Sequence, residues 1–194
     1  WGREGAAPGQ LRQPQGVAIA PDGTVLVADL RNSRVQRFAE DGSFLAAFGQ
    51  LGAGDGEFAW PTDVDVAPDG TLLVTDSGIA GGANNRIQQF RADGTYLGQW
   101  GVSGGLPGQM RDPYSIAISP DGRVYVADLG NHRVQAFAAD PMPTWRTELF
   151  GNRWLASRAL RVGHAEDLDF DWGGEAPGPD VPADGFSVRF ERGL

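Results

Sequence analysis

Length, composition and charge narrow the classes of protein that this sequence can encode. The chain has 194 residues, of which 41% are hydrophobic, and its six Trp and ten Phe are typical of a packed globular protein. A formal net charge of -9 would repel phosphate groups, so we expect no nucleic acid partner. The absence of Cys excludes disulfides and thiolate nucleophiles, and without an apolar run of about 18 residues we expect no membrane insertion by this segment.

Three similar segments occupy most of residues 1–140. They span residues 14–49, 61–101 and 113–141. In the first segment VAIA, TVLVAD, RVQRF and SFLAAF have the composition of four short strands, and Pro-Asp-Gly joins the first two. Proline presets φ, aspartate bonds the local backbone and glycine accepts a positive φ, so this tripeptide predicts a tight turn. We therefore expect three four-stranded antiparallel sheets.

The predicted strands are apolar on both faces. TLLVTD and RVYVAD are examples, and such strands favour sheets packed between neighbouring sheets over a sheet with one wet face. Repeats of this length with Gly-rich turns are typical of the blades of a β-propeller. We expect the branched side chains of the innermost strands to point between the sheets. These side chains are Val17, Ile19, Val64, Val66, Ile116 and Ile118.

A polar corner follows the second strand of each segment. It reads DLRNSRVQRF at residues 29–38 and DLGNHRVQAF at residues 128–137. The segments resemble the NHL repeat over residues 1–140, and this resemblance implies an all-β, partial β-propeller of three four-stranded NHL-type blades around a central channel. Because three blades cannot close a ring, we expect the chain to be an excerpt of a longer protein, with the remaining blades as partners.

The polar corner could be either an active site or a turn. His132 in the third segment is replaced by Ser33 in the first and by Asn85 in the second. Catalysis needs a unique residue, so a position that varies among the copies favours a turn held by Asp and Asn bonds to the backbone. We therefore assign no catalytic residue here.

The second segment differs from the others on its innermost strand. It carries Asp63 and Asp65 where the first segment has Gly16 and Ala18. Period-two geometry places both carboxylates on one face, where like charges are costly unless water, an arginine or a cation compensates them. One interpretation is a hydrated or Arg-paired couple, and the other is a cation or polar-ligand site. Calcium is the candidate metal, and no other cofactor is expected. The neighbours of such a site would be Thr62, Tyr114 and Ser115.

A different sequence follows once the repeat ends near Asp140. Residues 145–194 contain LFGNRWL, DFDWGGEAPG and DGFSVRFERGL. These stretches resemble the start of the protective-antigen-like domain, a β-sandwich of which many members bind sugars. The resemblance implies a truncated β-sandwich segment and a carbohydrate-recognition module in the complete protein. TELFG, at residues 147–151, could either complete the third blade or begin the tail module.

Two functions are compatible with these patterns. The first is a non-catalytic binding or scaffold propeller joined to a carbohydrate-recognition module, in a larger bacterial protein that is secreted or exposed on the cell surface. Its ligand would be a protein or a glycan. The alternative is a propeller hydrolase or lyase whose site at the channel mouth is completed by blades absent from this chain.

Overall fold

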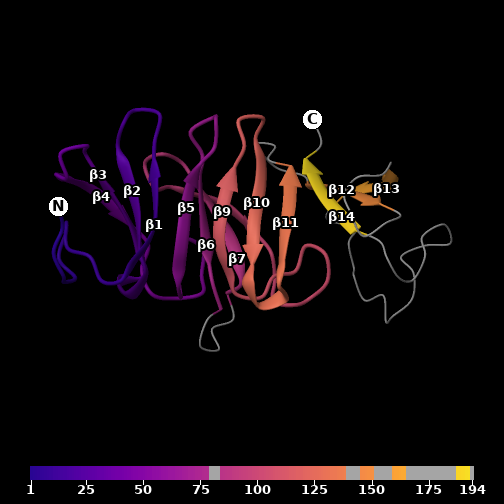
Figure 1. The fold of residues 1–194 in the computed structure, drawn as a ribbon, viewed down its shortest axis with the longest axis horizontal. Helices are drawn as coiled ribbons and strands as arrows, with labels where there is room; N and C mark the ends of the chain where they lie inside the picture. Colours follow the sequence, from indigo (N-terminus) through magenta and orange to yellow (C-terminus); the bar gives the residue numbers. More distant parts are fainter. Residues whose placement is uncertain (79–83, 139–144, 151–158, 165–186, 193–194) are drawn as a thin grey trace. The chain divides into compact units, whose positions relative to one another are not determined.

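The fold consists almost entirely of β-strands, as the sequence predicts (Figure 1). The computed structural model describes residues 1–78, 84–138, 145–150, 159–164 and 187–192. Within these ranges the helical elements are two 3-10 turns, at Leu30–Asn32 and Leu129–Asn131, and no helix is long and apolar enough to cross a membrane. The chain forms two compact units, one of residues 1–121 and 125–135 and the other of residues 122–124 and 136–194.

The first two repeats form four-stranded sheets in which each strand pairs with the next along the chain. The pairs are antiparallel, as predicted. Blade one contains β1 (Pro14–Ile19), β2 (Val25–Asp29), β3 (Arg34–Phe38) and β4 (Phe44–Phe48). Blade two contains β5 (Pro61–Val66), β6 (Leu72–Asp76), β7 (Arg86–Phe90) and β8 (Tyr96–Trp100).

The third repeat forms a sheet of three described strands, where four were predicted. Blade three contains β9 (Pro113–Ile118), β10 (Arg123–Asp128) and β11 (Arg133–Ala138), in the order β11-β10-β9. The strand that TELFG contributes to, β12 (Trp145–Phe150), pairs instead with β13 (Ala159–His164) and β14 (Ser187–Arg192). Of the two alternatives for TELFG, the structure therefore places Thr147–Phe150 in the tail sheet.

Local side-chain bonds shape the hairpins between strands. In the Pro-Asp-Gly turn of blade one, Asp22 Oδ1 accepts a hydrogen bond from the Thr24 amide at 3.1 Å, and Gly23 has a φ of 81°. Asp69 does the same for Thr71 at 2.9 Å in blade two. These turns depend on neighbouring residues alone, which is why the sequence predicts them well.

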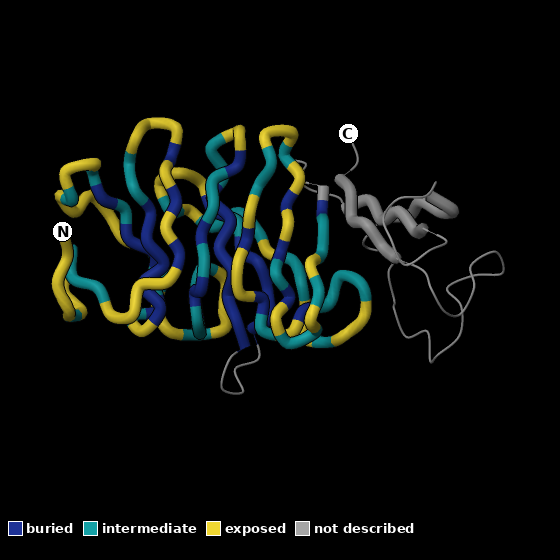
Figure 2. The backbone as a smooth tube through the Cα atoms, in the orientation of Figure 1, coloured by how far each residue is buried: buried dark blue, intermediate teal, exposed yellow. Residues whose placement is uncertain are grey.

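One apolar cluster joins the first two blades. Side chains from both sheets are buried together, and the buried segments lie between adjacent sheets (Figure 2). Burying a large apolar side chain contributes about 1.5–3 kcal/mol, so this cluster is the main force that holds the two blades face to face. Its members are Ala18, Leu26, Ala28, Val35, Phe58, Val64, Leu72, Val74 and Phe90.

The innermost branched side chains, which are predicted to point between the sheets, are buried or partly buried in blades two and three and exposed in blade one. Val64 and Ile116 are 2% and 5% exposed. Val17 and Ile19 are 62% and 72% exposed. These positions all point toward the blade that precedes their own, and in the described residues no sheet lies on that side of blade one. Burial at these positions therefore depends on a neighbouring blade rather than on the strand itself.

The innermost strands of blades one and two approach very closely at Gly16. A Cβ atom there would lie 2.1 Å from Asp63 Oδ1 and 2.5 Å from Asp63 Cα. Neither distance is compatible with a side chain, so glycine is required for the backbones to come together at this level.

Candidate functional site

The innermost strands β1, β5 and β9 carry the polar residues that the sequence singles out. These strands are neighbours in space, because β5 contacts both β1 and β9. Asp63 and Asp65 on β5 are partly buried, whereas Ser115 on β9 is exposed. The arrangement therefore brings carboxylates of blade two against the backbone and hydroxyl groups of blade three.

Both carboxylates of blade two bond to blade three. Asp63 Oδ2 accepts hydrogen bonds from Ser115 Oγ at 2.7 Å and from the Ile116 amide at 3.0 Å. Asp65 Oδ2 accepts one from the Ile118 amide at 2.7 Å. Hydrogen bonds to an ionised acceptor are about twice as strong as neutral ones. Asp63 and Asp65 therefore tie β5 to β9 across the seam between two blades.

The remaining oxygens of the carboxylate pair also have protein donors. Asp63 Oδ1 accepts from the Val64 amide at 2.9 Å, and Asp65 Oδ1 accepts from the Val66 amide at 2.8 Å. Backbone N–H groups thus offset the negative charge, a means of compensation that the sequence interpretation did not consider. Among the described residues no group of three or more His, Cys, Asp or Glu side chains could hold a metal ion, and calcium at this pair stays a prediction.

The other predicted neighbours divide into one buried and one exposed residue. Thr62 is buried, and its Oγ1 lies 2.8 Å from Thr75 Oγ1 and donates to the Pro113 carbonyl. Tyr114 is 38% exposed, and its hydroxyl donates to Gln15 Oε1 on β1 at 2.5 Å. Thr62 therefore has no open path to a ligand, while Tyr114 and Gln15 form an exposed contact between blades three and one.

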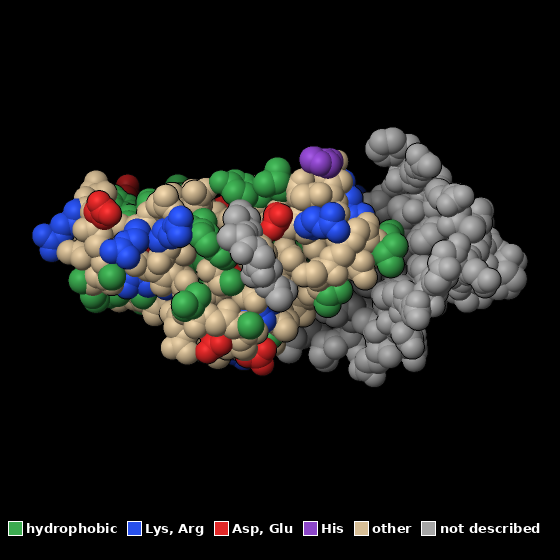
Figure 3. Space-filling model, turned by 90° about the horizontal axis from the view of Figure 1, so that it is seen from below, with side chains coloured by type: hydrophobic (Ala, Val, Ile, Leu, Met, Phe, Trp, Pro, Cys, Tyr) green, Lys and Arg blue, Asp and Glu red, His purple; other side chains and the backbone are tan. Residues whose placement is uncertain are grey.

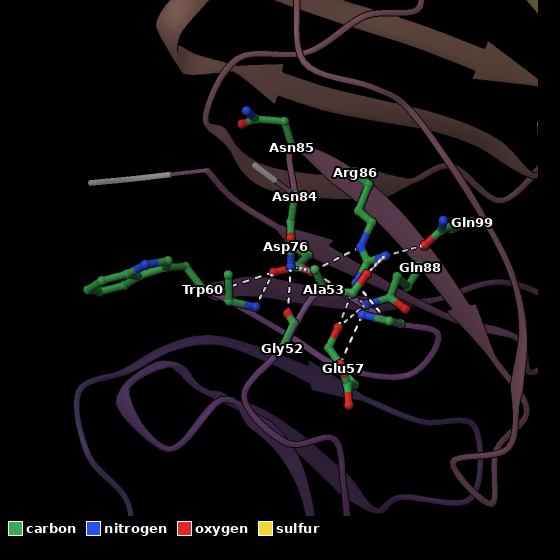
Figure 4. A network of polar contacts seen from close by, with 12 residues as sticks. Gly52, Ala53, Glu57, Trp60, Asp76, Asn84, Asn85, Arg86, Gln88 and Gln99 are labelled. Carbon is green, nitrogen blue, oxygen red and sulfur yellow. Dashed lines mark hydrogen bonds and ion pairs between the residues drawn. The ribbon is translucent and has the colours of Figure 1, made fainter. Parts of the chain in front are cut away.

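A second polar arrangement lies at the corner between the second and third strands of each blade. In blade two its centre is the buried Asp76 at the end of β6 (Figure 4). Asp76 Oδ1 accepts from the amides of Ala59 and Trp60 at 2.9 and 3.1 Å. Asp76 Oδ2 accepts from Asn84 Nδ2 at 2.7 Å and from Arg86 Nε at 3.1 Å. Burial raises the pKa of the Asp76 carboxyl, and the donors from Trp60, Asn84 and Arg86 oppose the rise.

Arg86 extends this corner to the loop that enters the blade. Its guanidinium donates to the carbonyls of Ala53, Gly54 and Glu57 at 2.8–2.9 Å, and to Gln99 Oε1 at 2.5 Å. The loop of residues 49–60 connects β4 of blade one to β5 of blade two. Arg86 therefore fixes the connection between two blades to the corner of the second.

The same corner occurs in all three blades. In each one an Asp accepts from an Arg Nε, at 2.8 Å in blade one and 2.7 Å in blade three. In each one a Gln Oε1 accepts from a loop glycine amide at 2.9–3.0 Å. We call these residues the corner networks. They are Asp29, Asn32, Arg34 and Gln36; Asp76, Asn84, Arg86 and Gln88; and Asp128, Asn131, Arg133 and Gln135.

The corner has the backbone geometry of a turn, as the sequence predicts. Ser33, Asn85 and His132 have left-handed backbones, with φ of 51°, 40° and 54°. The amides of Ser33 and His132 close the 3-10 turn by bonding to the carbonyl of Leu30 and of Leu129. The sequence prediction included Asp and Asn but missed Arg and Gln. The signal was present, because Arg and Gln follow Asp by five and seven positions in blades one and three.

The face on which the corners lie carries charges of both signs. Seen from below, Arg, acidic and apolar side chains are interspersed over the described blades (Figure 3). Arg31 lies over the ring of Trp60, 4.6 Å from its centroid, and donates to Gln13 Oε1 at 2.7 Å. This pair joins the corner of blade one to the start of blade two.

Comparison with known proteins agrees with this architecture. The NHL repeat family matches residues 11–38 and 110–137. Peptidyl-glycine alpha-amidating monooxygenase A of Xenopus laevis is 37% identical over 121 residues, which are 58% of this chain and 13% of that protein. Human NHL repeat-containing protein 3 is 40% identical over 60 residues, 31% of this chain and 17% of that protein. The chain thus spans less than a fifth of the length of either relative.

Solved structures include similar folds at low sequence identity. A streptogramin B lyase superposes with a TM-score of 0.49 and 18% identity, over 66% of this chain and 38% of the lyase. Residues 11–38 and 110–137 thus match the NHL repeat, and these residues form parts of two of the consecutive antiparallel sheets.

Proposed function

We propose that residues 1–138 act as a non-catalytic binding or scaffold segment of a β-propeller. The observation that carries this proposal is that hydrogen bonds within the protein engage the acidic side chains. Asp63 and Asp65 tie blade two to blade three, and Asp76 is enclosed by donors from the entering loop and from β7. Groups engaged in this way hold a rigid platform together, and rigid platforms suit recognition by their exposed surface.

The exposed surface of the innermost strands is the proposed ligand contact. Gln15, Tyr114 and Ser115 are exposed there and present an amide and two hydroxyl groups. Such groups recognise the hydroxyls of a glycan or the backbone of a peptide through hydrogen bonds. The ligand class that we propose is accordingly a glycan or a protein segment.

The proposal extends to the tail and to location. The resemblance of residues 145–194 to the protective-antigen-like domain supports a carbohydrate-recognition module, and β13-β12-β14 form an antiparallel sheet of the kind found in sandwiches. DFDWGGEAPG and parts of LFGNRWL and DGFSVRFERGL, which carry this resemblance, lie outside the described residues. We place the complete protein outside the cell or on the cell surface, where glycans are accessible.

An enzyme is the second candidate. The relatives that match over 121 residues are named as monooxygenases. These names support a propeller that is joined to a catalytic domain or that forms part of such a domain. In that case the site would lie at the channel mouth and would be completed by blades outside this chain. Turnover of a bound ligand, rather than binding alone, distinguishes this candidate.

A glycan array and a peptide array probed with the purified chain test the proposal, with and without calcium chloride. The ligands found are then measured by calorimetry against Tyr114→Phe and Ser115→Ala. Tyr125→Phe is the matched control, since Tyr125 is also 38% exposed but lies on β10. Weaker binding by Tyr114→Phe with unchanged binding by Tyr125→Phe is expected. Equal binding by both variants would contradict the proposed contact, and chemical conversion of the ligand would favour the enzyme.

A further inference from the structure

An arginine and a tryptophan meet at the seam between blades one and two. Arg31 is exposed at the corner of blade one, and its guanidinium carbon lies 4.6 Å from the centroid of the Trp60 ring. Arg31 Nε also donates to Gln13 Oε1 at 2.7 Å. Two contacts therefore fix a side chain that is ordinarily mobile when it is exposed, so a ligand that binds Arg31 loses less conformational entropy.

The charge of Arg31 is not paired, unlike the charges of the arginines in the corner networks. Each of those arginines pairs with a buried aspartate, as Arg34 does with Asp29 at 2.8 Å. Arg31 is held by the neutral groups of Gln13 and Trp60, and in the described part of the chain no carboxylate pairs with it. Because Nε is engaged, Nη1 and Nη2 remain as a planar pair of donors for an anion.

The seam between blades two and three shows that the fold does not require this pair. By repeat position, Gly78 of blade two corresponds to Arg31, and Asp112 of blade three corresponds to Trp60. A glycine and an aspartate cannot form a stacked cation and ring, yet β5 of blade two still contacts β9 of blade three. The pair at the first seam is therefore free to serve a ligand.

The pair lies at the same end of the innermost strands as the proposed ligand contact. Gln13 directly precedes β1, in which Gln15 is the second residue, and Trp60 directly precedes β5. Gln15 accepts the hydrogen bond from the Tyr114 hydroxyl. The Trp60 ring points away from the corner network (Figure 4), and Trp60 is only partly buried. Part of the indole is therefore accessible at this end of the strands.

We propose that Arg31 and Trp60 bind a carboxylate-bearing sugar of a glycan, with Arg31 holding the carboxylate and Trp60 packing against the sugar ring. This site rests on the glycan-binding function proposed above and narrows its ligand to acidic glycans. A uronic acid combines a carboxylate with an apolar ring face, and a guanidinium beside an indole matches both. An acidic peptide would use Arg31 alone. A single carboxylate suits the protein, because the net charge of -9 opposes a polyanion.

Calorimetric titration of the complete chain with two tetrasaccharides tests the proposal. One is a glucan tetrasaccharide that ends in a single glucuronic acid, and the other ends in glucose instead. We expect the acidic form to bind at least about tenfold more tightly, as is typical of a charged hydrogen bond. Arg31→Gln should abolish this preference and leave the binding of the neutral form unchanged, whereas Trp60→Leu should weaken both.

Arg91→Gln is the matched control, because Arg91 is also exposed but lies in the turn between β7 and β8. It should keep the full preference for the acidic form. Circular dichroism establishes that each variant is folded. If Trp60→Leu does not fold, Gln13→Ala takes its place, since it removes one of the two contacts that fix Arg31 and should weaken binding of the acidic form.

The outcomes separate this site from the proposed contact at Tyr114. Absence of binding by the acidic form, or equal binding of the two forms, would overturn the site. Loss of binding in Tyr114→Phe with no change in Arg31→Gln would also overturn it and would leave the proposed function standing. Equal binding of a hexaglutamate peptide, dependent on Arg31 and unaffected by Trp60→Leu, would replace the sugar with an acidic peptide and so overturn the assignment.

Discussion

Replacing Arg86 with methionine should destabilise the protein strongly. The substitution keeps the apolar length of the side chain but removes the guanidinium from a site where Asp76 is fully buried. Breaking a buried ion pair from one side costs about 3–5 kcal/mol, because the remaining charge is left without its partner. The carbonyls of Ala53, Gly54 and Glu57 also each lose the hydrogen bond from Arg86, which adds to the loss.

Arg37 provides the matched control for this substitution. It pairs with Asp22 at 2.5 Å, but that carboxylate is largely exposed, and exposed ion pairs contribute about 0–1 kcal/mol. Urea unfolding followed by tryptophan fluorescence gives the two free energies. We expect Arg86→Met to lose at least about 2 kcal/mol more than Arg37→Met. Equal losses would refute the assignment of Arg86 as the residue that fixes the loop between blades.

Three further predictions concern the same contacts. Because burial raises the pKa of Asp76, its contribution to stability is largest below the unfolded value of about 3.9 and decreases as pH rises through the folded pKa. The stability of wild type relative to Asp76→Asn should therefore fall over that window in urea titrations, and a flat difference would contradict it. Gly16→Ala should lower the free energy of unfolding by about 1–3 kcal/mol, whereas Gly98→Ala, whose Cβ would meet its nearest atom at 3.8 Å, should lower it much less. Asp65→Asn should lower the melting temperature because the Ile118 amide loses an ionised acceptor, and Asp69→Asn in an exposed turn serves as the comparison.

The sequence predicts those features that depend on neighbouring residues. Pro-Asp-Gly turns, strand alternation and the turn at the polar corner all follow from local chemistry, and the structure contains each of them. The burial of Val64 and Ile116, by contrast, depends on the neighbouring blade that covers each side chain.

Features that depend on distant partners could not be predicted in the same way. Asp63 accepts a hydrogen bond from the Ile116 amide, which is more than fifty positions away in the sequence. The periodicity of the strands does not reveal the register that places Ile116 opposite Asp63. Thr62 carries a hydroxyl group, as an exposed site residue could, but it is buried against Thr75 and Pro113. The exposure of Val17 depends on whether a blade covers it, which the pattern of its own strand does not determine.

Hydrogen exchange at the amides of Ile116 and Ile118 tests most directly whether Asp63 and Asp65 tie the blades together. These amides donate to the two carboxylates at 3.0 and 2.7 Å. In an Asp63→Ala, Asp65→Ala double variant we expect both amides to exchange faster than in wild type. The amide of Val27 on β2, which lies in blade one, should exchange at an unchanged rate. Unchanged protection at Ile116 and Ile118 in the double variant would contradict the role of the carboxylate pair.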